Sequence, residues 1–380
     1  MTKEKLPVLI VGAGPVGLLL ANLLGQQNVE CLLIDKEREL PDWSRALAVT
    51  PASLALLKRA GLATPFIENG VRVERARVYD ERAEAGVLDF SGLRSDFPFV
   101  LSLPQADTMT LLREVLPRHP SVTFCPGLEL KGLIPGESSA RALLGVPGAR
   151  RSFGVDASWI IGCDGAASTT RAAAGIDFTF RSSPPGFVTA DYLDQTGWGA
   201  EARLFFAAGE SLESFPLPLD RRRWIASRSQ GALDGELLKT RALRLCGVDL
   251  QGLACAKERE FVPEYLLADT FWRGRVILAG DAAHVMGPTG GQGMNLGFAD
   301  ADLLAALYPL LAKPGAAMRL LSNYESTRKN EFRSACAQAA TGLWISARTG
   351  VVTSSFGSLF FRWALRAPAA YRRLAGSRFA

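Results

Sequence analysis

Residues 6–35 read LPVLIVGAGPVGLLLANLLGQQNVECLLID, and this stretch decides the fold. An apolar run from Leu6 to Val11 predicts a buried strand, and the glycine turn after it leads into a helical pattern from Pro15 to about Gln26. A second apolar run, residues 31–34, closes on the acidic residue Asp35. The order strand, glycine turn, helix, strand is typical of a βαβ unit in a parallel sheet.

The glycines of this turn have the spacing GxGxxG. Gly12 permits a tight turn, Gly14 lets a diphosphate approach the backbone, and Gly17 lets the helix pack closely, while the helix N-terminus attracts negative charge. Asp35 can accept hydrogen bonds from ribose hydroxyls, which favours NAD or FAD over NADP but does not choose between them. We predict an adenine dinucleotide site here, with an ordinary glycine turn as the alternative. Its candidate residues are Gly12, Gly14, Pro15, Val16, Gly17, Asp35 and Lys36.

The composition is that of a globular protein. The 380 residues are 48% hydrophobic and carry a formal net charge of +5, which allows one large α/β domain with a smaller one and does not indicate a nucleic-acid partner. No apolar run approaches the ~18 residues that a membrane-spanning helix needs. The six cysteines form no CxxC pair and have no histidine at metal-ligand spacing, so we expect no metal, reduced thiols and a cytoplasmic location.

The rest of the chain interrupts the parallel pattern twice. Residues 71–103 and 178–262 carry apolar residues separated by charges and glycines, which predicts antiparallel strands. A buried strand returns at 276–279, and helical patterns follow from near Met294 and from Leu320 onward. We therefore predict three parts. They are a discontinuous nucleotide-binding domain at 1–70, 104–177 and 263–315, a β-rich substrate domain at 71–103 and 178–262, and a C-terminal helical segment at 316–380.

Two further motifs identify the dinucleotide. Residues 159–171 read WIIGCDGAASTTR, and residues 274–297 read GRVILAGDAAHVMGPTGGQGMNLG. In this order they resemble the FAD-dependent aromatic hydroxylases of the para-hydroxybenzoate hydroxylase type, and the resemblance covers most of residues 6–310. It implies FAD as the cofactor and an α/β fold with a Rossmann-like, GR2-type FAD-binding domain. In that family the two motifs follow the two excursions into the substrate domain, and both interruptions found above lie in those intervals.

The third motif also has a physical logic of its own. Asp281 directly follows a buried strand and is placed to bind a polyol hydroxyl, and residues 287–293 form a turn that opens a helix near Met294. Such a helix start offers free N–H groups and a partial positive charge. By resemblance the amides of Met294 and Asn295 face the flavin N1 and C2 region, with Pro288 near the reactive flavin edge. A strand, loop and helix without a ligand is the alternative.

The resemblance assigns further residues to the cofactor. Asp164 and Arg171 would join a hydrogen-bond network around the flavin and nicotinamide, although a pair that only fastens a turn is the alternative. Arg45 matches the diphosphate-facing arginine and Gln105 the flavin-contacting glutamine, and either could instead be a surface residue. The assigned residues are Arg45, Gln105, Asp164, Arg171, Gly280, Asp281, Gly293, Met294 and Asn295, with Pro288 as the catalytic candidate.

The activity that the resemblance implies is that of a monooxygenase. NADH or NADPH would reduce FAD transiently, dioxygen would add at flavin C4a, and the hydroperoxide would hydroxylate a small aromatic or electron-rich substrate. A halogenase or a reductase on the same fold, or a non-catalytic FAD-binding redox protein, are the alternatives; the WxWxIP segment typical of halogenases is missing. No coiled coil or interface pattern is evident, so the sequence allows a homodimer without requiring it.

No catalytic base stands out in the sequence. The chain has two histidines: His119 lies in a polar turn that we expect to be solvated, and His284 follows the Gly-Asp motif, where a structural role is favoured. Tyr192 is a conceivable partner of the substrate from its placement alone. Candidate lining segments of the substrate pocket are Phe205–Phe206, Phe215–Leu219 and Trp224, with plain core residues as the alternative.

The segment after about Thr341 carries arginines among apolar residues. A basic amphipathic helix can bind a membrane surface or an acidic partner. We expect instead that its apolar face packs on the body of the protein and leaves the arginines in water.

Overall fold

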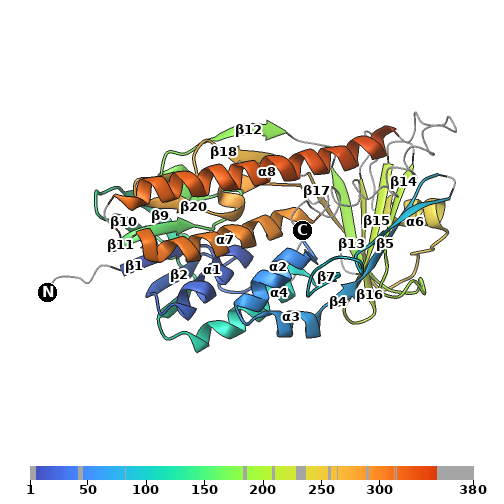
Figure 1. Cartoon of the computed structure of the whole chain (residues 1–380), viewed down its shortest axis with the longest axis horizontal. Helices are drawn as coiled ribbons and strands as arrows, with labels where there is room; N and C mark the ends of the chain where they lie inside the picture. Colours follow the sequence, from blue (N-terminus) through green and yellow to red (C-terminus); the bar gives the residue numbers. More distant parts are fainter. Residues whose placement is uncertain are drawn as a thin grey trace.

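The computed structural model describes a three-part arrangement in which a long helix bridges two halves (Figure 1). The described residues are 6–41, 46–81, 83–182, 186–207, 210–227, 237–255, 258–262, 264–287, 291–311, 313 and 315–348. Most of the arginine-containing C-terminal segment therefore lies outside the described residues. No helix in the described part of the chain combines the length and the apolar character that crossing a bilayer requires.

The first half is built on a mostly parallel sheet with the predicted βαβ unit at its centre. The strand order is β19-β20-β11-β1-β2-β8, and β1 pairs in parallel with both β11 and β2. A hairpin of β9 and β10 pairs with β11 through its second strand. The strands are β1 (Leu6–Val11), β2 (Cys31–Asp35), β8 (Val122–Pro126), β9 (Glu129–Ile134), β10 (Ala140–Gly145), β11 (Phe153–Gly162), β19 (Trp272–Arg273) and β20 (Val276–Leu278).

Helices pack on this sheet because their apolar faces match its buried strands. The first helix begins at Pro15, as predicted, and is buried along almost its whole length against β1 and α7. The elements are α1 (Pro15–Gln26), α2 (Pro51–Arg59), α3 (Ala63–Asn69), α4 (Gln105–Val115), η1 (Leu116–Arg118), α5 (Thr169–Ala173), η2 (Gly280–Ala282), α7 (Gln292–Leu311) and α8 (Ala316–Arg348). The sheet, the helices and the loops between them form one large apolar core.

The second half is a mostly antiparallel sheet in the order β17-β13-β16-β15-β14-β5-β6. Its only parallel pair among the described strands joins β14 to β5, which links the two interruptions predicted from the sequence. The elements are β5 (Arg75–Tyr79), β6 (Glu84–Asp89), β13 (Phe187–Leu193), β14 (Ala202–Ala207), β15 (Glu210–Leu217), β16 (Arg221–Ser227), β17 (Arg259–Phe261) and α6 (Leu237–Cys246).

This large sheet has two faces of different character. On the outer face, residues such as Tyr192, Leu212 and Trp224 pack against α6, which lies on the side away from the first half (Figure 1). The opposite residues of the same strands form the inner face, which is turned toward the first half. They are Thr189, Asp191, Glu213, Phe215, Arg223 and Ile225.

Two small sheets and α8 join the halves. The sheet β3-β7-β4 lies beside α2–α4, and the sheet β12-β18-β21 lies near α8 (Figure 1). Helix α8 packs along α7 and reaches β15 of the large sheet. The strands are β3 (Ala48–Val49), β4 (Val71–Val73), β7 (Val100–Ser102), β12 (Phe178–Ser182), β18 (Tyr265–Ala268) and β21 (His284–Val285). The α/β fold class predicted from the sequence is confirmed.

Candidate cofactor and substrate site

The glycine turn after β1 is packed too tightly for side chains at two positions. Gly12 has a φ of +102°, and a Cβ there would lie 2.5 Å from the carbonyl oxygen of Cys163. A Cβ at Gly17 would overlap the carbonyl oxygen of Gly12. The turn is fixed by hydrogen bonds from the Gly12 amide to Ile34 (2.8 Å) and from the Cys163 amide to Val11 (2.7 Å). These two glycines are therefore required by the packing of the turn itself.

Gly14 lies in open space instead. No heavy atom outside its own neighbourhood lies within 4 Å of a Cβ placed there, and its φ of −68° suits any residue. Gly14 is the N-cap of α1, no side chain caps this helix end, and Pro15 occupies the first turn. The amides of Val16 and Gly17 are then available to an anion, since the first N–H groups of a helix have no partner within it. This arrangement fits a diphosphate.

The carboxylate of Asp35 closes the same turn from the end of β2. One of its oxygens accepts a hydrogen bond from the Ala13 amide (2.6 Å), and the other accepts one from the Glu37 amide (2.8 Å). Lys36 is exposed beside it. Asp35 thus has a structural task that the sequence did not indicate, and its contact with a ribose stays a prediction.

The second motif lies directly behind the glycine turn. Asp164 accepts hydrogen bonds from the Ser168 hydroxyl (2.5 Å) and from the amide and hydroxyl of Thr170 (2.9 and 3.0 Å), so it shapes the start of α5. Arg171 donates to the carbonyl oxygens of Ala166 (2.9 Å) and Ala282 (3.2 Å). Its guanidinium also lies 3.8 Å from the centre of the Phe178 ring. Arg171 therefore ties the second motif to the third.

The third motif meets the first through Val16. Gly280 has a φ of +59°, and a Cβ there would lie 2.9 Å from Cγ2 of Val16. A Cβ at Gly297, on α7, would overlap the same methyl group. The glycines at 280 and 297 thus let α1, η2 and α7 meet around one valine side chain. Asp281, the next residue, is exposed at this junction, where a polyol hydroxyl could reach it.

The start of α7 is anchored by the side chain of Asn295. Its amide nitrogen donates to Ala48 (2.9 Å) and Gly291 (2.6 Å), and its oxygen accepts from the Thr50 amide (3.0 Å). The Asn295 side chain is therefore structural, while the backbone amides of Met294 and Asn295, which the resemblance assigns to the flavin, lie near the start of α7.

A buried charge network lies beneath this helix start. Asp300 of α7 is fully buried and accepts hydrogen bonds from the Gly280 amide (2.7 Å), from Nε2 of His284 (2.7 Å) and from Nε of Arg328. Arg328 also donates to the carbonyl oxygen of Leu296 (2.9 Å). His284 lies between the rings of Phe271 and Phe332. The structural role favoured for this histidine agrees with its complete burial.

The charges of this network stabilise one another. Burial by itself would raise the pKa of the Asp300 carboxyl, but attraction to His284 and Arg328 and hydrogen bonds from His284 and the Gly280 amide hold that pKa below its usual range. The network fixes Gly280 against α7 and α8. Sequence reasoning could not reveal this network beyond His284, because Asp300 and Arg328 lie in ordinary helical patterns.

The resemblance also predicts contacts with the cofactor for Gln105, Arg45 and Pro288. Gln105 begins α4, its amide donates to Ala46 (3.0 Å), and its side chain is half-buried with a weak contact to Met109. Arg45 and Pro288 lie outside the described residues. Their assignments stay predictions, as do the cofactor contacts of Gln105.

The inner face of the large sheet carries charges that the sequence analysis missed. Arg223 and Asp191 form a bidentate pair with distances of 2.6 and 2.8 Å, and both residues are buried. The positive charge of Arg223 also acts on Asp107 of α4, although burial outweighs it and raises the pKa of the Asp107 carboxyl. Arg223 therefore lies opposite the helix that begins at Gln105. The signal was present in the run of three arginines that opens β16.

The side chain of Tyr192 points away from the inner face of the large sheet. It lies on the outer face, is fully buried, and its hydroxyl bonds Glu258 at 2.8 Å. Burial and this carboxylate raise the pKa of Tyr192 far above its ordinary value. Phe205 and Trp224 belong to the same outer core. Tyr192 is thus poorly placed as a partner of a substrate between the two halves.

His119 is not solvated as the sequence suggested. It packs against Gly25 of α1, and burial lowers the pKa of its imidazole. The residues of this turn are polar, but the turn packs against α1. Local composition could not reveal this tertiary contact.

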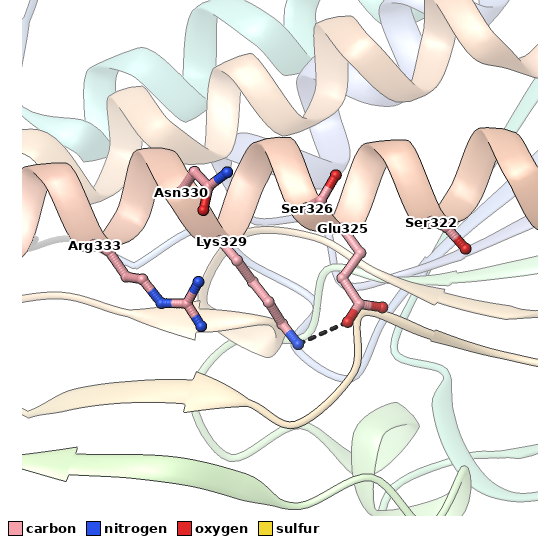
Figure 2. A pocket seen from close by; sticks show the side chains of 6 residues that line it. All are labelled: Ser322, Glu325, Ser326, Lys329, Asn330 and Arg333. Atoms are coloured by element: carbon pink, nitrogen blue, oxygen red, sulfur yellow. Dashed lines mark hydrogen bonds and ion pairs between the residues drawn. The ribbon is translucent and has the colours of Figure 1, made fainter.

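A surface groove lies on α8, away from the glycine motifs. It has a volume of about 280 Å³ and is lined by polar residues, among which Lys329 and Glu325 form an ion pair at 2.6 Å (Figure 2). Glu325 also accepts hydrogen bonds from the Thr270 hydroxyl and the Phe271 amide. These contacts fasten α8 to the loop before β19. Among the described residues no cluster of His, Cys, Asp or Glu is arranged to hold a metal.

Comparison with known proteins supports the cofactor assignment. The family described as FAD binding domain matches residues 5–339. Pentachlorophenol 4-monooxygenase from Sphingobium chlorophenolicum is 29% identical over 332 residues, which cover 84% of this chain and 61% of that protein. A 3-(3-hydroxy-phenyl)propionate/3-hydroxycinnamic acid hydroxylase from Klebsiella pneumoniae is 29% identical over 335 residues, which cover 86% and 60%. The chain thus spans about three fifths of the length of these relatives.

A solved structure of similar size shares the fold. The p-nitrophenol 4-monooxygenase from Pseudomonas putida superposes with a TM-score of 0.86 at 23% identity, over 98% of this chain and 99% of that one. The arrangement of a glycine-rich nucleotide half and a large antiparallel sheet is therefore a known architecture.

Proposed function

The chain belongs to the FAD binding domain family, and on that premise we propose that it is a monooxygenase that uses FAD, NADH or NADPH and dioxygen to hydroxylate a small aromatic substrate. The observation that supports this most strongly is the meeting of all three glycine motifs around Gly12 and Val16. The names of the relatives, which act on phenols or hydroxyphenyl acids, support the substrate class.

FAD, when bound, supplies the transfer of electrons from the nicotinamide and the activation of dioxygen. The residues of this chain would bind and orient it. The open helix end at Gly14 would take the diphosphate, Asp281 a ribityl or ribose hydroxyl, and the first-turn amides of α7 the electron-rich edge of the ring. The inner face of the large sheet would exclude water above the ring and hold the substrate.

The remaining expectations belong to the same proposal. A cytoplasmic location is supported by six cysteines that are all unpaired. A second subunit is not needed to complete the groups named above, so the proposed activity holds for a monomer or a homodimer. A halogenase or a reductase on this fold is the competing function.

The test is an absorption spectrum of the purified protein, taken before and after anaerobic addition of NADH or NADPH. We expect flavin bands that bleach faster when a phenol is present, and incorporation of one oxygen atom from labelled dioxygen into the product. Substrate-stimulated bleaching without oxygen incorporation would favour a reductase. Protein that stays colourless after reconstitution with FAD would overturn the proposal.

A further inference from the structure

Glu213 of β15 is an acidic residue on the inner face that the site described so far does not use. It is paired across the sheet with Ile225 on one side and Leu204 on the other, and both neighbours are apolar. The described residues offer Glu213 no hydrogen-bond or ion-pair partner. It is partly buried, so its carboxylate has lost part of its hydration without gaining a compensating bond.

Several neighbouring charges of the same sheet are paired. Arg223 is paired with Asp191, Arg222 with Asp194 (2.9 Å), and Glu210 of the same strand with Arg241 (3.1 Å). A sheet that pairs these charges and leaves one carboxylate among apolar side chains is unusual, because such a group is normally paired or neutral. Glu213 therefore lacks a hydrogen-bond partner that a ligand could provide.

A second polar group on the inner face also lacks a partner. Thr189 of β13 is 2% exposed, and its hydroxyl has no hydrogen-bond partner among the described residues. Thr189, Ile225 and Glu213 lie in one row across three adjacent strands. Because neighbouring strands are ~4.8 Å apart, the two polar residues flank Ile225 at a backbone separation of roughly 10 Å. That span suits a single aromatic ring with a polar substituent at each end.

This row is turned toward the nucleotide half. Arg223, on the same face, lies close enough to Asp107 of α4 to act on its charge. Phe215, the next inner-face residue along β15, packs with Ala76 and Ala202. The outer face of the same strands is covered by α6. A molecule held by the row would therefore lie between the sheet and the nucleotide half.

The electrostatics of Glu213 suit proton transfer. Desolvation by burial raises the pKa of its carboxyl to about 7. A general base works best when its pKa lies near the working pH, because it is then ionised often enough and still basic enough. A carboxyl at the usual pKa would be a much weaker acceptor of a phenol proton.

We propose that Glu213 binds the hydroxyl group of an aromatic substrate and accepts its proton, with Thr189 bonding a second polar substituent. The inference rests on the proposed hydroxylase function. In this step the bond between hydrogen and the substrate oxygen breaks, its electron pair stays on that oxygen as a phenolate, and a bond from the proton to a Glu213 carboxylate oxygen forms. The phenolate is the electron-rich form that hydroxylation requires, and the proton leaves later to solvent.

The test compares Glu213→Gln with wild type, using phenol as substrate in the FAD-loaded protein. We expect kcat/KM for phenol at neutral pH to fall by about 10²- to 10⁴-fold, the usual contribution of a general base. In wild type, kcat/KM should rise with pH through about 7 as Glu213 ionises. In Glu213→Gln the increase of kcat/KM through neutral pH should be absent. Its kcat/KM should increase only toward pH ~10, where phenols ionise without a base.

A second measurement separates proton transfer from a structural role. Pentachlorophenol is ionised at neutral pH, so it needs no base, and a carboxylate beside it is repulsive. Glu213→Gln should therefore lower its kcat/KM far less than that of phenol, and should tighten its binding by about five-fold, as one charge at close range in a partly hydrated site predicts. Binding is measured from the flavin difference spectrum at pH 8.

Glu210→Gln is the matched control. Glu210 lies on the same strand but on the outer face, where Arg241 and Arg244 already occupy it. It should keep the wild-type pH profile with both phenols. If Glu213→Gln also keeps that profile, this inference is wrong while the proposed function stands. If the flavin-loaded wild type hydroxylates no phenol, both proposals fail.

Discussion

Two acidic side chains, one in each half of the molecule, have opposite surroundings. Beneath the glycine motifs, the Asp300 carboxylate accepts three hydrogen bonds, and Arg328 has two further acceptors. On the inner face of the large sheet, Glu213 has no hydrogen-bond or ion-pair partner among the described residues, and neither has the Thr189 hydroxyl. A buried charge whose hydrogen bonds are formed holds the backbone in place, whereas one without partners gains stability from a ligand. The comparison indicates that the surroundings of Asp300 suit rigidity and those of Glu213 suit recognition.

The largest expected effect is that of replacing Asp300 in the buried charge network. Asp300→Ala breaks the buried ion pair with Arg328 and removes the acceptor of His284 and of the Gly280 amide, and removing one member of a buried pair typically destabilises a protein by about 3–5 kcal/mol. We expect a loss of this size in the free energy of unfolding by guanidinium chloride, together with loss of bound FAD because Gly280 is no longer held.

The exposed pair of Asp302 with Arg59 provides the control, since surface pairs contribute roughly 0–1 kcal/mol. Acid gives an independent check. Because the folded pKa of Asp300 is depressed, its stabilisation is present above the unfolded pKa of ~3.9 and is lost as the pH falls through the lower folded value. Asp300→Asn should make the free energy of unfolding less dependent on pH in acid. A pH dependence equal to that of the wild type would contradict this explanation.

The next effect concerns the glycine turn. Gly17→Ala forces a methyl group against the carbonyl oxygen of Gly12, so we expect about 1–3 kcal/mol of destabilisation in the apoprotein. Thermal unfolding without added FAD measures it. A stable apoprotein with this substitution would show that the turn can relax.

Gly14→Ala should behave differently from Gly17→Ala. The position is open and its backbone suits alanine, so the apoprotein should keep its stability. The methyl group would meet only the diphosphate, and we expect FAD affinity to fall by roughly ten-fold, about 1.4 kcal/mol. Titration of the apoprotein with FAD, followed by flavin fluorescence, measures this affinity. Equal destabilisation of the apoprotein by Gly14→Ala and Gly17→Ala would contradict the difference proposed between the two glycines.

The smallest effect is expected on the outer face. Tyr192→Phe removes one hydrogen bond to Glu258 and should lower the stability by about 1 kcal/mol. Substrate turnover should be unchanged because the hydroxyl lies on the α6 side of the sheet. A large loss of kcat with normal stability would show that the two faces are not functionally distinct.

Much of the fold followed from local patterns. The strands at 6–11 and 31–35 and the helix from Pro15 were predicted nearly to the residue, because apolar periodicity and glycine spacing are local signals. His119 was misjudged for the same reason, since a polar turn can still close over a helix. The pairing of β14 with β5 was not predicted, because strand partners distant in sequence leave no local trace.

The sequence by itself determined the βαβ unit, the three glycine motifs and hence the family and its cofactor, because these depend on residue types at fixed spacing. Tertiary structure alone decided that Asp300 completes a buried network and that Tyr192 and Glu213 lie on opposite faces of one sheet. The physical reason is that the face of a strand, and the charges opposite it, are set by packing between segments far apart along the chain.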